Sequence, residues 1–186
     1  TTQEPAWLDL AEAALRFIDE TLRSPAGFVT AAAPAGEAGK PWAPRPQTDE
    51  NIGVARLAIR LHHLSRSPAA RSVADHSMKY LAGAAAGANG VRAAGILLAA
   101  REFASEPVSI AVVGRRDDPR TAALLRAALA APAPYAIVRR FDPGESEEFG
   151  QDLGKPTAWV CAGGACSSPL HDPAALLRAC ALERNR

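Results

Sequence analysis

The chain has 186 residues and a formal net charge of +1; 48% of the residues are hydrophobic and only 5% are aromatic. This length suits one domain or two small ones, and the hydrophobic share is sufficient for a core. The near-neutral charge, with arginines scattered and no basic run interleaved with aromatics, argues against nucleic-acid binding and against electrostatic attraction to an anionic membrane.

The sequence gives no indication of a membrane partner. No apolar stretch reaches membrane-spanning length, and the first residues, TTQEPAWLDL, do not resemble a signal peptide. The three cysteines fit the cytosol, or a periplasmic protein with one disulfide and one further thiol. We leave the compartment open, favouring the cytoplasm.

The sequence pattern in the first half of the chain predicts helices. Glu4-Pro5 begins one that runs to about residue 22, because proline suits the first helical position, and its apolar face repeats at helical spacing. A loop rich in Gly, Ala and Pro follows; it contains Trp42 and a candidate short hairpin at 28–30. Further helices are expected at 48–65, 67–81 and 91–104.

The pattern changes near Glu106. Residues 108–114, VSIAVVG, form a short β-branched run typical of a buried strand, and YAIVRRF at 135–141 predicts a second. A helix expected at 118–130 separates them, which favours a parallel crossover. A third strand is expected at 157–161 and a last helix at 172–182.

We therefore predict a mixed α/β fold in two regions. Residues 1–106 form helical hairpins, and residues 107–186 form a small βαβ-type parallel sheet with a loop between Cys161 and Cys166.

The tail PTAWVCAGGACSSPLHDPAAL holds Trp159-Val160-Cys161, four residues, Cys166 and then Asp172-Pro173. Upstream lie Gly27-Phe28, Arg45-Pro46, the pattern D-x-N-x-x-x-A-x-L from Asp49 to Leu57, and a strand ending in VVG. In this order the pieces resemble the C-terminal region of thioredoxin-domain-containing proteins of the YyaL type.

The resemblance implies that the helical hairpins are part of an α/α toroid similar to six-hairpin glycosidases. Two hairpins cannot close a ring of six, so we expect an exposed apolar patch or a homodimer that buries it. The implied partner is an upstream thioredoxin-like domain or a separate partner protein. The implied function is a non-catalytic structural or interaction module. The alternatives are a thiol–disulfide accessory that uses Cys161 and Cys166, and a carbohydrate-related binding module.

The cysteines are the main candidate site. The four residues between Cys161 and Cys166 include two glycines, so the chain can turn back and bring the pair within disulfide range. The alternative is two separate thiols. We expect both sulfurs at the carboxyl edge of the sheet, near His171 and the start of the last helix, with Cys180 a buried thiol.

Two further sites are considered. A zinc set would use Cys161, Cys166, His171 and Cys180, whose residue types suit that metal. An anion site would use Gly114, Arg115 and Arg116, between a strand and a helix start.

No cofactor is expected, because the G-x-G-x-x-G and P-loop patterns are absent. No catalytic residue is assigned either. A pairing of a histidine (His62, His63 or His76) with Asp49 or Asp75 lacks support, and the acidic loop at 142–148 lacks the alternating ligands of a calcium loop.

Overall fold

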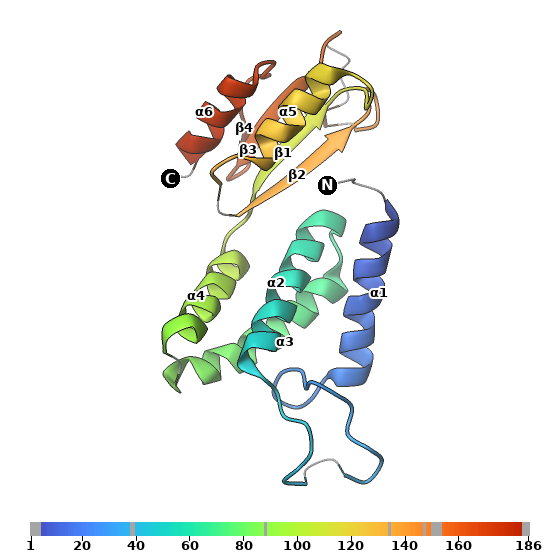
Figure 1. The fold of residues 1–186 in the computed structure, drawn as a ribbon, viewed down its shortest axis with the longest axis vertical. Coiled ribbons are helices and arrows are strands. Elements are labelled where there is room, and N and C mark those ends of the chain that lie inside the picture. Colours follow the sequence, from blue (N-terminus) through green and yellow to red (C-terminus); the bar gives the residue numbers. More distant parts are fainter. Residues whose placement is uncertain are drawn as a thin grey trace. The chain divides into compact units, whose positions relative to one another are not determined.

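The computed structural model describes residues 5–37, 40–87, 89–133, 135–146, 148–149 and 154–183. It divides the chain into two compact units, Thr2–Ser105 and Glu106–Arg186. Helices make up the regular structure of the first unit, while the second holds a four-stranded sheet with two helices (Figure 1). The fold is therefore mixed α/β, as predicted.

The helical unit contains α1 (Pro5–Leu22), α2 (Thr48–Ser65), α3 (Pro68–Ala84), a 3-10 turn (Ala85–Gly87) and α4 (Gly90–Ala104). Only Arg66 and Ser67 separate α2 from α3, so the two helices form a hairpin. The Ser67 hydroxyl accepts a hydrogen bond from the Ala70 N–H at 3.2 Å, which caps α3. The core between α1, α2 and α3 is made by buried apolar residues: Leu15, Phe28, Ala58, Ile59, Leu61, Ala70, Val73 and Ala74.

The loop between α1 and α2 is held by polar contacts. The buried Asn51 side chain accepts a hydrogen bond from the Phe28 N–H at 2.8 Å and donates to the Phe28 carbonyl at 2.9 Å. The short hairpin considered at 28–30 is present only as isolated antiparallel bridges, one between Phe28 and Arg23 and one between Val29 and Pro46. Asn51 offers Phe28 the same donor and acceptor that a pairing strand would offer, so both backbone groups of Phe28 are satisfied.

The sheet of the second unit has the order β2-β1-β3-β4. Strand β1 (Val108–Val113) runs parallel to β2 (Ala136–Phe141), and α5 (Pro119–Leu129) connects them. This is the predicted strand–helix–strand crossover.

The expectation of a parallel sheet is wrong for the third strand, because β3 (Thr157–Ala162) pairs with β1 in the antiparallel direction. The described parts of the connection, 142–146, 148–149 and 154–156, contain no helix that would carry the chain back across the sheet. The chain therefore re-enters the sheet from the edge at which β2 ends, and β3 runs the opposite way.

One face of the sheet is covered by α5 and by α6 (Pro173–Glu183). Alternate strand residues point to this face, as the period of two requires, and pack on Leu124 and Leu176. The opposite face presents a smaller cluster made by Ala111, Val113, Phe141, Phe149, Trp159 and Cys161. Loops can build a site at either end of the strands of this sheet.

Candidate functional site

The structure joins Cys161 and Cys166 in a disulfide that closes a β-hairpin. Cys161 lies in β3 and Cys166 in β4 (Ala165–Cys166), directly opposite one another and with their Cα atoms 4.0 Å apart. Gly163 and Gly164 form the turn with φ of 56° and 78°. A two-residue turn with positive φ at both positions matches the twist of the strands, and glycine adopts it at least cost.

The two cysteines differ in exposure. Cys166 is exposed on a two-residue edge strand, whereas Cys161 is half-buried and packs beside the cluster that contains Trp159. Cys180 is buried in α6 and lies outside the disulfide.

The expected position of the pair at the carboxyl edge of the sheet is wrong. Because β3 is antiparallel to β1, Cys161 pairs with Ser109, near the start of β1. His171 lies at the other end of β3, where its Nδ1 is 3.2 Å from Thr157 Oγ1 and 3.2 Å from the Pro156 carbonyl. Neither His171 nor the start of α6 is therefore placed to activate either cysteine.

The zinc set is not assembled. Cys161 and Cys166 are bonded to each other, so neither offers a thiolate, and His171 contacts Thr157 at the far end of the strand. Among the residues that the structure describes, no group of three histidine, cysteine or acidic side chains is arranged to hold a metal ion.

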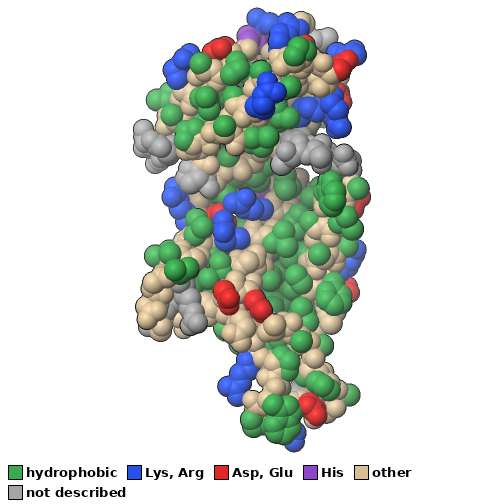
Figure 2. Space-filling view, viewed as in Figure 1, with side chains coloured by type: hydrophobic (Ala, Val, Ile, Leu, Met, Phe, Trp, Pro, Cys, Tyr) green, Lys and Arg blue, Asp and Glu red, His purple; other side chains and the backbone are tan. Residues whose placement is uncertain are grey.

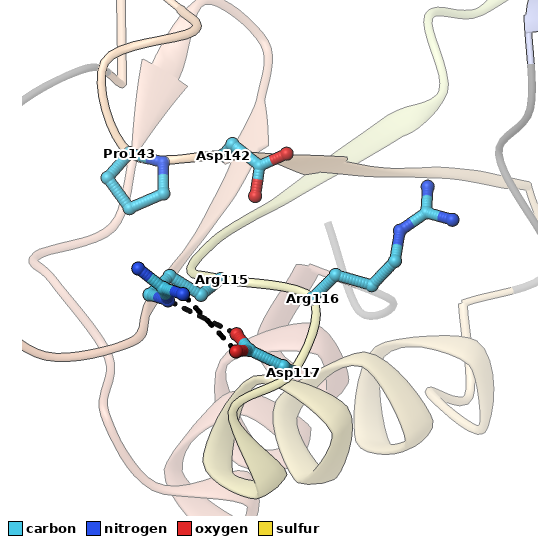
Figure 3. Close-up of a pocket in the computed structure, with 5 residues that line it drawn as sticks. All are labelled: Arg115, Arg116, Asp117, Asp142 and Pro143. Atoms are coloured by element: carbon cyan, nitrogen blue, oxygen red, sulfur yellow. Dashed lines mark hydrogen bonds and ion pairs between the residues drawn. The ribbon is translucent and has the colours of Figure 1, made fainter.

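The loop after β1 lies at the opposite edge and lines an open depression of about 610 Å³ (Figure 3). Arg115 hydrogen-bonds Asp117 through two nitrogens at 3.1 and 3.2 Å, and this lowers the pKa of the Asp117 carboxyl. Arg116 extends away from this pair (Figure 3). Across the depression, Arg140 hydrogen-bonds Asp142 at 2.8 Å, which lowers the pKa of that carboxyl.

These contacts weaken the case for an anion site at Gly114, Arg115 and Arg116. The depression is lined by two arginines and two aspartates, so its charges balance. Gly114 has a packing role: a Cβ there would overlap Thr121 Oγ1, which is buried at the start of α5. Glycine thus allows α5 to approach the end of β1 closely.

His62 and His76 of the helical unit contact the backbone. His76 Nε2 lies 3.0 Å from the Ser24 carbonyl and 3.1 Å from the Gly27 carbonyl, and His62 Nδ1 lies 2.9 Å from the Ser67 carbonyl. The nearby Asp75 forms an ion pair with Arg71 instead. His62 and His76 therefore hold turns in place, and neither contact is the histidine–aspartate pairing considered from the sequence.

Sequence reasoning missed a buried charge cluster. Glu102 of α4 is fully buried and receives hydrogen bonds from Arg56 at 2.8 and 2.9 Å and from Arg60 at 3.0 Å. One feature of the sequence would have indicated it: Glu102 is spaced three residues from Ala99, a core position on the same helix face. A buried carboxylate needs a partner of opposite charge, and Arg56 and Arg60 lie one turn apart on α2, so they were the candidate partners of Glu102.

No family model matches the sequence, and the search of curated proteins finds no significant match. No helix in the described part of the chain is long and apolar enough to cross a membrane.

Proposed function

We propose that this chain is a non-catalytic interaction module that packs, through the outer face of α1, against a further amphipathic helix of a larger helical assembly. The observation that carries the proposal is the exposure of three large apolar side chains on that face. Trp7, Leu10 and Phe17 are 62%, 60% and 59% exposed. In Figure 2, which has the same view as Figure 1, hydrophobic side chains lie on the surface at the place where Figure 1 labels α1.

The spacing of these residues suggests a second packing surface. Leu8, Ala11, Leu15 and Ile18 form the inner face, which packs on the core of the helical unit. The outer face repeats at positions 7, 10, 14 and 17, with intervals of three and four residues. Together the two faces span about 180°, or half of the helix circumference, at about 100° per residue. An amphipathic helix with one packing partner needs a stripe of only about 100°.

A helix fits this outer face better than a lipid surface does. Intervals of three and four residues are those at which one helix packs its ridges against another. The polar side of α1 carries both signs of charge, including Asp9, Arg16 and Glu20, so it offers no net attraction to an anionic membrane.

The resemblance to YyaL-type proteins supports the same proposal. In such a toroid the helical hairpins of this chain adjoin others, and the covering helix belongs to the upstream part that carries the thioredoxin-like domain. The backbone contacts of His62 and His76 support a structural rather than a catalytic role for the helical unit.

The proposal is tested by removing the outer face without touching the core. We expect the isolated chain to self-associate with rising concentration in sedimentation velocity and to bind a hydrophobic dye. The Leu10→Asp/Phe17→Asp variant should abolish both effects at an unchanged melting temperature. Arg16→Glu is the matched control, since it changes the net charge by the same amount on the same helix and should preserve both.

Two results would contradict the proposal. One is a wild-type chain that stays monomeric and binds no dye at the highest concentration. The other is self-association that Leu10→Asp/Phe17→Asp leaves unchanged, because a different surface would then be responsible.

A further inference from the structure

The hairpin that carries the disulfide is also held by hydrogen bonds that do not involve the sulfurs. The Ser167 N–H donates to the Val160 carbonyl at 2.8 Å, and the Val160 N–H donates to Ser167 Oγ at 3.1 Å. Further along, Ala158 and Leu170 exchange two backbone hydrogen bonds of 2.7 and 2.9 Å. These bonds pair the returning chain with β3 over residues beyond the disulfide.

The disulfide also closes a short loop and lies at an accessible edge. The two cysteines are five residues apart in sequence, so the bond removes few conformations from the unfolded chain. It lies on β4, the last strand of the sheet, with Cys166 exposed. Exposed disulfides of this kind are typically labile or catalytic, whereas shielded ones that close long loops are structural.

We infer that Cys161–Cys166 is a thiol–disulfide exchange site whose substrate is a dithiol, and that Cys166 Sγ is the atom the substrate attacks. This inference is independent of the α1 surface. The difference in exposure between the two residues sets the direction of attack: an incoming thiolate attacks Sγ of the exposed Cys166, and the half-buried Cys161 is the leaving group.

The exchange balances in two steps. A thiolate of the dithiol bonds to Cys166 Sγ, the Cys161–Cys166 bond breaks, and its electron pair stays on Cys161 Sγ, which takes a proton from water. The second thiolate of the dithiol then attacks the dithiol's own sulfur in the mixed disulfide and releases Cys166, which is protonated in turn. The protein gains two electrons and two protons, and the dithiol loses both and becomes a disulfide.

The hairpin makes the reverse step feasible. Its turn and backbone hydrogen bonds keep the two Cα atoms opposite one another after reduction, so the thiols remain in position to close again. Cys180 does not compete, because it is fully buried in α6.

The first test uses the native chain with dithiothreitol as the dithiol. After the dithiothreitol is removed by rapid desalting, alkylation of the folded chain near neutral pH and peptide mapping should show label on Cys161 and Cys166 but not on the buried Cys180. The far-ultraviolet circular dichroism should not change. Oxidised glutathione should then restore the disulfide. The inference is overturned if the pair is reduced only on unfolding, if reduction unfolds the chain, or if the reduced pair does not reoxidise.

The second test assigns the attacked sulfur. Cys161→Ser leaves the exposed thiol of Cys166, and Cys166→Ser leaves the half-buried thiol of Cys161. We expect the first variant to react roughly tenfold faster with Ellman's reagent. Because exposure alone sets this ordering, the second test assigns the attacked sulfur, and the first test decides whether the pair exchanges reversibly. Equal rates, or a faster Cys161, would overturn the assignment of Cys166.

Discussion

At the scale of single residues, two buried polar side chains decide how the helical unit is held together. Asn51 fixes the loop at Phe28, and Glu102 joins α4 to α2 through Arg56 and Arg60. Both side chains are fully buried, so their partners are required rather than optional.

Replacing Asn51 with alanine should destabilise the chain by about 2–4 kcal/mol, because it leaves the N–H and the carbonyl of Phe28 without their partner. Urea unfolding measures the loss. Asn89→Ala is the matched control: that side chain is exposed and makes no capping hydrogen bond, so the change should stay within about 0.5 kcal/mol. Equal losses in the two variants would show that Asn51 does not hold the loop.

Glu102 gives the molecule a pH-dependent contribution to stability. Burial raises the pKa of its carboxyl, but hydrogen bonds from Arg56 and Arg60 lower it more, so the folded pKa lies below the ordinary value of 4.5. A lowered folded pKa stabilises the fold above the unfolded pKa, and this contribution is lost as the pH falls through the folded pKa.

The Glu102→Gln substitution tests this pH-dependent contribution to stability. Near neutral pH the substitution should cost about 1–3 kcal/mol in free energy of unfolding, reduced by the partial exposure of both arginines. The difference from wild type should shrink below about pH 4.5, measured by thermal unfolding across a pH series. The exposed Glu20→Gln should show no such trend, and a difference constant with pH would contradict the ion-pair cluster.

At the scale of elements, α1 is the helix whose two faces should behave differently. Leu15 is 4% exposed in the core, and Phe17 is 59% exposed on the outer face. Leu15→Ala should cost about 2–4 kcal/mol, whereas Phe17→Ala should change the stability by no more than about 0.5 kcal/mol. Chemical denaturation of the pair measures both. A large loss in Phe17→Ala would mean that the outer face is already packed within this chain.

The strands mark the limit of prediction from sequence at this scale. A β-branched run ending in glycine was enough to find β1, and the intervening helix was enough to orient β2. The residues of β3 carry no information about strand direction, because the period of two is the same either way. Because β3 runs antiparallel to β1, the disulfide lies at the end of the sheet opposite to the one expected.

At the scale of the whole molecule, the mixed α/β composition and the order of the elements could be predicted, since both rest on local pattern. The contacts that join distant segments could not. Arg56 and Glu102 are 46 residues apart, and Phe28 and Asn51 are 23 apart. The turn between Cys161 and Cys166 is a local feature, so Gly163 and Gly164 were enough to predict that it could form.

The central claim is that α1 presents an outer face made for another helix, and hydrogen–deuterium exchange at low and high protein concentration tests it most directly. Without the proposed covering helix, the isolated chain should bury this face against a second copy as the concentration rises. Extra protection should then appear in peptides from 5–22 and be absent from those of β3 and α6. Leu10→Asp/Phe17→Asp should remove it. Protection that appears in the α/β unit, or no concentration dependence in α1, would contradict the claim.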